Sequence, residues 1–135
     1  MLEKSYRILV LDDSDLIRVM LGSTLFDLGF KEVDFGEDGA IGFNMLVEAF
    51  EEGKPYDLVF TDWSMPNMTG IELLKKCRQN PDFKKIPIVI ITAESDSSQV
   101  VQALRLGATE FIVKPFSQEA LKKKLEKFNK RIVGT

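Results

Sequence analysis

Three aspartates, a threonine and a lysine are the residues of this chain that could combine to do chemistry. Asp12 and Asp13 follow the mostly apolar run at 7–11, Asp62 follows 57–61, Thr92 ends 88–92, and Lys114 ends 111–114. Three neighbouring carboxylates repel one another, and one lysine cannot neutralise them, so a divalent cation is the natural complement. Mg²⁺ suits such a site best, with Mn²⁺ as a substitute, because it takes carboxylate oxygens and keeps several waters.

A metal, a lysine, a hydroxyl and an exposed carboxylate together are suited to phosphoryl transfer. The metal and Lys114 would offset charge that develops on the phosphoryl oxygens, while Asp62 attacks in line and becomes an aspartyl phosphate. Asp13 and Asp62 would bind the metal directly, and Asp12 through water. This chemistry requires that the fold bring all these side chains to one place.

Five apolar runs alternate with helical patterns, which predicts an α/β fold with a parallel sheet. The runs RILVL (7–11), DLVFT (57–61), IVIIT (88–92) and FIVK (111–114) are typical of strands covered on both faces. The run VDF (33–35) is short and interrupted by Asp34, so we expect an edge strand. Parallel strands end at one edge of a sheet, where such folds bind ligands, and this edge would carry the five polar residues.

The intervening stretches have helical spacing of apolar residues. We expect a first helix with Leu16, Ile17, Met20, Leu21, Leu25 and Leu28 on its inner face and Gly29 at its end, and a second over about 38–52 ending at Gly53. Thr69 and Glu72 form a T-x-x-E capping box that would open the third. A fourth is expected over about 96–106 before Gly107, and a fifth from near Ser117 with Leu121, Leu125 and Phe128 facing inward.

Composition narrows the remaining possibilities. The 135 residues suit one domain, 1–135 with a core of about 5–130, and the net charge of −3 does not favour nucleic acid. The absence of histidine excludes most catalytic triads and zinc sites, and the one cysteine, Cys77, is expected to be a buried or half-buried helix residue. No signal peptide or membrane-spanning segment is apparent, so we expect a cytoplasmic monomer. The lysine-rich run at 122–131 keeps helical spacing and is interpreted as a solvated helix face.

The motifs DD (12–13), DWSMPNMTG (62–70), TAE (92–94) and KPF (114–116) together resemble the receiver domain of two-component response regulators. The resemblance covers nearly the whole chain and is closest to the single-domain chemotaxis regulators of the CheY type. It implies a flavodoxin-like, doubly wound five-stranded parallel sheet in the order 2-1-3-4-5 with five helices.

The resemblance also implies roles for individual residues. Asp62 would be the phosphoacceptor, and Lys114 and the hydroxyl of Thr92 would bind the phosphoryl group. The metal ligands would be Asp12, Asp13, Asp62 and the backbone carbonyl of Trp63. The Lys114–Pro115 peptide bond is expected to be cis.

A second set of residues would govern signalling. Phe111 is at the position of the family's switch aromatic and would enter space that Thr92 vacates, which changes the face formed by the fourth helix, fifth strand and fifth helix. Ser64 and Glu94 occupy the positions that tune dephosphorylation. This chain departs from CheY in having Phe111 instead of tyrosine and Ser64 instead of asparagine. Asp96 and Ser97 replace lysines, which weakens the transfer of a flagellar-motor partner.

The function implied is a phosphorylation-activated signalling switch that catalyses only its own phosphorylation and dephosphorylation. A histidine kinase would supply the phosphoryl group, a downstream protein such as the flagellar motor switch would read the changed face, and a phosphatase could reset it. Alternatives are a receiver excised from a larger regulator, a phosphorelay intermediate, an unphosphorylated scaffold and an aspartate-nucleophile magnesium phosphatase. That phosphatase is disfavoured because Ser64 stands where its second aspartate is needed. A flavodoxin-like cofactor binder is disfavoured because Asp12, Asp13 and Asp15 would repel a phosphate.

Overall fold

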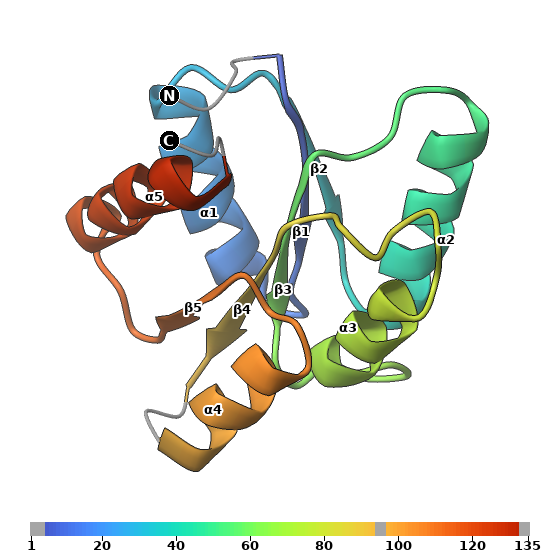
Figure 1. The fold of residues 1–135 in the computed structure, drawn as a ribbon. Coiled ribbons are helices and arrows are strands. Elements are labelled where there is room, and N and C mark those ends of the chain that lie inside the picture. The colour runs from blue at the N-terminus through green and yellow to red at the C-terminus, as the bar shows by residue number, and fades with distance from the viewer. Residues whose placement is uncertain (1–4, 94–96, 133–135) are drawn as a thin grey trace.

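The computed structural model describes residues 5–93 and 97–132, with side chains described for 5–93 and 98–126 (Figure 1). Strands and helices alternate along the chain. The strands are β1 (Arg7–Leu11), β2 (Glu32–Gly36), β3 (Leu58–Asp62), β4 (Ile88–Thr92) and β5 (Glu110–Val113). The helices are α1 (Asp15–Asp27), α2 (Gly39–Glu51), α3 (Gly70–Arg78), α4 (Ser97–Arg105) and α5 (Gln118–Ile132).

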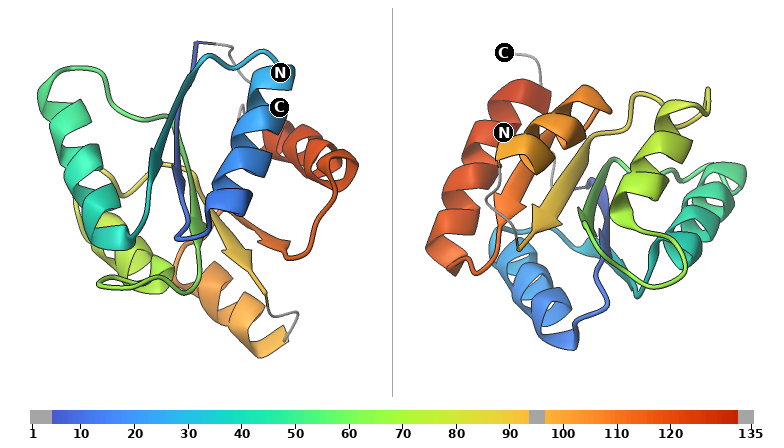
Figure 2. Two further views of the ribbon diagram at one scale, coloured as in Figure 1. Left: turned by 180° about the vertical axis from the view of Figure 1, so that it is seen from behind. Right: turned by 90° about the horizontal axis from the view of Figure 1, so that it is seen from below.

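All neighbouring strands are parallel, and their order is β2-β1-β3-β4-β5. Helices α1 and α5 cover one face of the sheet, while α2 and α3 cover the other, as Figures 1 and 2 show. This is the predicted doubly wound arrangement, and its strand order is the one that the resemblance implies. Every strand therefore ends at the same edge of the sheet, next to the residues singled out for chemistry.

The two core clusters follow from the alternation of side chains along each strand. In β1, Leu9 and Leu11 lie in the cluster beneath α2 and α3, while Ile8 and Val10 lie in the cluster beneath α1 and α5. The other central strands alternate in the same way, and their side chains are almost fully buried. Covering on both faces explains why these strands are continuous apolar runs instead of alternating apolar and polar residues.

Local signals in the sequence set the ends of the helices. The hydroxyl of Thr69 accepts a hydrogen bond from Glu72 N at 3.1 Å, and the Glu72 carboxylate accepts one from Thr69 N at 3.0 Å, which confirms the capping box of α3. Gly29, Gly53 and Gly107, predicted to end helices, have positive φ angles of 101°, 77° and 107°. The Lys114–Pro115 bond is cis, as expected.

Several predicted details need correction. Leu16 is 67% exposed instead of facing the core, and Leu21 and Leu25 carry the buried side of α1. Strand β2 is at the predicted edge but spans two more residues than expected, β3 includes Asp62, and β5 begins at Glu110 and ends before Lys114. Leu121 and Leu125 are buried and Cys77 is fully buried, as predicted, whereas the side chain of Phe128 and the start of the fourth helix at 96 lie outside the described residues.

Candidate metal and active site

The carboxyl ends of β1 and β3 bring three aspartates together. Each of Asp12, Asp13 and Asp62 offers a carboxylate oxygen, and the three oxygens lie within 4.8 Å of one another. Asp12 and Asp62 are buried, with 0% and 7% of their surfaces exposed, and Asp13 is exposed. The sequence interpretation took Asp62 to be the exposed carboxylate; it is instead largely buried as the last residue of β3.

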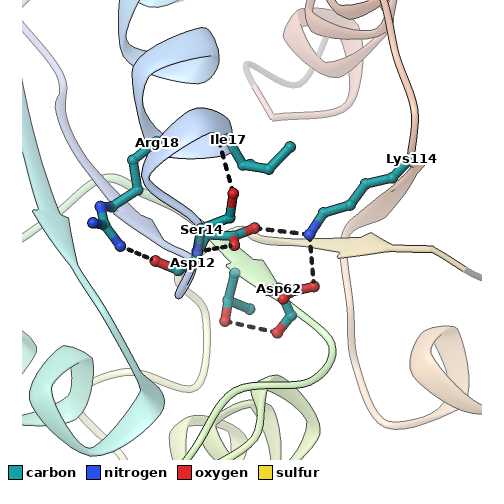
Figure 3. Close-up of polar contacts among 7 residues, drawn as sticks. Asp12, Ser14, Ile17, Arg18, Asp62 and Lys114 are labelled. Atoms are coloured by element: carbon teal, nitrogen blue, oxygen red, sulfur yellow. Dashed lines mark hydrogen bonds and ion pairs between the residues drawn. The ribbon is translucent and has the colours of Figure 1, made fainter.

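Lys114 extends from the end of β5 to the two buried carboxylates (Figure 3). Its Nζ lies 3.1 Å from Asp12 Oδ2 and 3.3 Å from Asp62 Oδ1. One ammonium is thus shared by two carboxylates, and Asp13 lies on the solvent side of the cluster. The three carboxylates and one ammonium leave a local excess of negative charge.

The backbone around Asp12 orients its side chain. Asp12 Oδ1 accepts a hydrogen bond from Ser14 N at 2.8 Å, and the hydroxyl of Ser14 accepts one from Ile17 N at 3.3 Å to cap α1. Arg18 donates to the backbone carbonyl of Asp12 (Figure 3). Asp12 Oδ2 is buried and forms the ion pair with Lys114. Within the described residues it accepts no further hydrogen bond.

The electrostatics of Asp62 and Lys114 reflect this crowding. Burial raises the pKa of Asp62, the charge of Asp12 raises it further, and Lys114 offsets part of that increase. Burial acts to lower the pKa of Lys114, but the ion pairs with Asp12 and Asp62 raise it overall. The Lys114 ammonium is therefore a stable positive charge, and the cluster still favours a second source of positive charge.

The donor set fits a hard divalent cation. All three candidate side chains present carboxylate oxygens within 4.8 Å of one another, and among the described residues the contact of Asp12 Oδ2 is the ion pair with Lys114, which Asp62 shares. Mg²⁺ and Mn²⁺ prefer oxygen ligands, and a partly exposed cluster leaves room for the waters that Mg²⁺ retains. The residues present are therefore suited to hold the predicted ion.

The loop after Asp62 partly engages one predicted ligand. The carbonyl of Trp63 accepts a hydrogen bond from Gly70 N at 3.0 Å, so one of its two lone pairs is directed to the first residue of α3. Trp63 N donates to the carbonyl of Ile91 at 2.8 Å and thereby extends the pairing of β3 with β4. Backbone carbonyl orientation depends on the path of the loop, which the motif alone does not reveal.

A pocket of about 270 Å³ opens beside Asp62. It is lined by Asp62, Trp63, Ser64, Thr92, Ala93, Gln99 and Lys114. Thr92 is 2% exposed, Ser64 is exposed, and Gln99 comes from α4. Five of the predicted site residues thus share one pocket, while Glu94, the second expected tuning residue, lies outside the described residues.

Phe111 is on the sheet face that carries Thr92. Phe111 pairs in register with Ile90, and Val113 pairs with Thr92. Because side chains two residues apart share a face, Phe111 and Thr92 are diagonal neighbours, a separation that an aromatic side chain can bridge. The structure therefore places the two predicted switch residues on the same face of adjacent strands.

The start of helix α2 is hydrogen-bonded to the loop that follows Asp62, a feature that the sequence interpretation missed. Asp38, the N-cap of α2, accepts hydrogen bonds from Ile41 N and from the Asn67 side-chain amide, both at 2.8 Å. The Gly39 backbone N–H donates to the carbonyl of Met68 at 3.0 Å. Asn67 has a positive φ of 67°, which asparagine tolerates. An acid before a helical pattern signals a cap, but nothing local reveals its second partner 29 residues away.

Gly70 is a second residue whose role the sequence interpretation missed. A Cβ atom at this position would lie 1.9 Å from the carbonyl oxygen of Asp62. Only glycine lets the start of α3 pack this closely against the end of β3. The turn around Asp62 is thus compact because residue 70 has no side chain.

Comparisons with known proteins agree with this geometry. The family described as the response regulator receiver domain matches residues 8–126. Chemotaxis protein CheY-3 of Vibrio cholerae serotype O1 is 38% identical over 131 residues, which cover 97% of each chain. Chemotaxis protein CheY1 of Helicobacter pylori is 41% identical over 120 residues, which cover 89% of this chain and 94% of that protein.

A solved structure gives the same result in three dimensions. The chemotaxis response regulator CheY4 of Vibrio cholerae matches with a TM-score of 0.76 and 34% identity, over 91% of this chain and 98% of that one.

A membrane span requires a long and apolar helix. None of the helices within the described residues is long and apolar enough to cross a membrane.

The family follows from the sequence matches. The chain belongs to the response regulator receiver family, and its curated relatives are CheY chemotaxis proteins.

Proposed function

We propose that this protein is a phosphorylation-activated switch of a two-component system and that Asp62 is its phosphoacceptor. The observation that carries the proposal is the cluster at the end of the sheet. Three carboxylate oxygens lie within 4.8 Å, and the Lys114 ammonium lies 3.3 Å from Asp62 and 3.1 Å from Asp12. This arrangement supplies a nucleophile, a positive charge and a set of oxygen ligands in one place.

In the proposed reaction, a carboxylate oxygen of Asp62 forms a bond to phosphorus. The bond between phosphorus and the donor's leaving atom breaks, and its electron pair departs with the leaving group. Lys114 would pair with the incoming phosphoryl oxygens, and Thr92, which lines the same pocket, would donate its hydroxyl to them. The buried position of Asp62 strengthens these interactions because little water competes for them.

Asp12, Asp13 and Asp62 would hold the metal ion. When bound, Mg²⁺ would offset the negative charge of the carboxylates and of the phosphoryl group. A backbone ligand would come from this loop: the Trp63 carbonyl keeps one lone pair beside its hydrogen bond from Gly70 N, and the neighbouring Ser64 carbonyl accepts no backbone hydrogen bond within the described ranges, so we propose these two oxygens as the candidates. Ser64 and Glu94 are retained as the proposed determinants of phosphoryl-group lifetime.

The proposed output is a change of the face formed by α4, β5 and α5. Attraction of Thr92 to the phosphoryl group would open space on the sheet face that Phe111 shares, and the ring would move toward it. The register of β4 with β5 supports this step, since it makes the two side chains diagonal neighbours. A partner that binds one position of Phe111 better than the other would read the phosphorylation state.

The proposed partners follow from the relatives, which are chemotaxis proteins. We propose a histidine kinase as the phosphodonor and a downstream protein, such as the flagellar motor switch, as the target. A phosphatase that acts on the aspartyl phosphate would complete the cycle.

Beryllofluoride, which mimics an aspartyl-bound phosphoryl group, tests the proposal directly. Trp63 is the only tryptophan of the chain and directly follows Asp62, so its fluorescence reports on the site. We expect a saturable fluorescence change on addition of beryllofluoride with Mg²⁺, and no change when Mg²⁺ is withheld. The Asp62→Asn variant should give no change under either condition. A full response in that variant would refute the assignment of Asp62.

A further inference from the structure

The side chain of Phe111 is held from outside the sheet by a residue of α5. Lys124 Nζ lies 4.5 Å from the centre of the Phe111 ring. The same ammonium lies 3.6 Å from Glu110 Oε1, and that oxygen accepts a hydrogen bond from Phe111 N at 3.0 Å. One lysine thus contacts both the ring of Phe111 and the carboxylate that binds its backbone.

These contacts are well suited to fix the ammonium. Glu110 is buried, with 7% of its surface exposed, and the Lys124 side chain is 31% exposed. An ammonium over an aromatic face is attracted by the negative charge density of the ring. The ion pair with Glu110 positions Lys124 over that face, since the carboxylate belongs to the residue next to Phe111.

We propose that Lys124 is a positioning residue that holds Phe111 in its present, half-buried position and thereby sets the threshold of the switch. This inference rests on the proposed function, in which Phe111 moves toward Thr92. The cation–π contact exists only while the ring stays beneath Lys124, whereas the ion pair with Glu110 does not require the ring. Movement of Phe111 therefore breaks one attraction, and the phosphoryl group must compensate for it.

The size of the effect follows from the size of such a contact. A cation–π contact at a partly exposed site corresponds to about a two- to fivefold shift in an equilibrium. We call the position in which the Phe111 ring has moved toward Thr92 its inner position. Without Lys124, this inner position should be populated about two- to fivefold more. If the inner position dominates when the phosphoryl mimic is bound, the affinity for that mimic must rise by the same factor.

The direction of this change separates the proposal from a simple charge effect. The Lys124→Met variant loses a positive charge, which by itself should weaken binding of an anionic ligand. The proposal predicts the opposite result, about two- to fivefold tighter binding of beryllofluoride with Mg²⁺. Lys123→Met is the matched control, because Lys123 is an exposed neighbour on the same helix. Its affinity should be unchanged or slightly reduced.

A conservative variant and a second measurement complete the test. Lys124→Arg keeps a cation that can stack on the ring and pair with Glu110, so it should restore the wild-type affinity. The aromatic ¹H–¹³C resonances of Phe111, recorded without any ligand, should shift in Lys124→Met and remain in place in Lys123→Met. An unchanged Phe111 spectrum, or equal affinities of the Lys124→Met and Lys123→Met variants, would overturn the proposal.

This design separates failure of the inference from failure of the proposed function. If the wild-type protein binds no beryllofluoride, the proposed function fails, and the ligand-free spectra of Phe111 still decide whether Lys124 positions the ring. If the wild-type protein binds the mimic and the variants at Lys124 behave like those at Lys123, only the inference fails.

Discussion

At the scale of single residues, Asp13 differs from the other two aspartates of the cluster. It is exposed, whereas Asp12 and Asp62 are buried and paired with Lys114. In the proposed metal site Asp13 would therefore be a ligand that takes no part in the ion pairs of Lys114. This difference makes it the residue at which metal binding can be changed with least effect on the rest of the site.

The Asp13→Asn variant should bind Mg²⁺ at least about tenfold more weakly, because losses of 10–100-fold accompany changes even to groups that only support metal ligands. Asp15→Asn is the control, since the Asp15 side chain is 92% exposed and is not one of the three clustered carboxylates. Titration of Mg²⁺ followed by Trp63 fluorescence measures both. Equal weakening in the two variants would point to general surface charge instead of a ligand at Asp13.

The composition of the site could be predicted from the sequence because its residues follow the ends of strands. The apolar runs locate those ends to within a residue, and parallel strands must end at one edge of a sheet. Contacts that depend on the detailed path of the chain could not be predicted. The engagement of the Trp63 carbonyl by Gly70 and the placement of Lys124 over Phe111 join elements whose relative position the sequence does not state.

At the scale of elements, the ends of two helices shape the loop after Asp62. The start of α3 packs against the carbonyl of Asp62, and the start of α2 binds Asn67 and Met68. The sequence predicted where both helices begin, since Asp38 and Thr69 are typical N-caps. It did not predict that their first residues restrain the loop after Asp62. The exposed position of Leu16 shows the same limit, because apolar spacing alone does not say which turn of a helix meets the core.

The Gly70→Ala variant should lower the free energy of unfolding by about 1–3 kcal/mol, the usual cost of forcing an extra methyl group into a packed site. Its Cβ would lie 1.9 Å from the Asp62 carbonyl oxygen, so the strand end and the helix start must separate. We expect weaker binding of beryllofluoride as well, because Asp62 moves. Urea unfolding and the fluorescence titration measure these effects. Wild-type values in both would show that the backbone is not constrained here.

Asp38 should make the stability of the fold depend on pH. Its hydrogen bonds from Ile41 N and Asn67 lower the pKa of its carboxyl in the folded protein. A lowered pKa stabilises the folded state at pH values above the unfolded value of about 3.9, and this contribution is lost as the pH falls through the folded value.

The Asp38→Asn variant keeps a capping side chain but has no charge. It should be less stable than the wild type by about 0.3–1 kcal/mol near neutral pH, the usual value of a charge at a helix N-terminus. The difference should shrink toward zero in acid. Urea unfolding at several pH values measures it, and a difference that stays constant down to the acid limit would show that the charge of Asp38 is not responsible.

At the scale of the whole molecule, one apolar cluster packs on each face of the sheet, and this packing fixes the positions of the strand ends. The carboxylates of Asp12 and Asp62 are therefore held in place by the packing of the strands that carry them. The contact of Lys124 with Phe111 lies on β5, at the edge of the sheet opposite β2.

The most direct measurement is the location of the phosphoryl group after reaction with acetyl phosphate and Mg²⁺. Reduction of the acyl phosphate with borohydride followed by peptide mass spectrometry identifies the modified residue. We predict one modified site, Asp62, that requires Mg²⁺ and is absent in the Asp62→Asn variant. Modification of another residue at the same rate, or equal labelling of Asp62 without a divalent cation, would contradict the account.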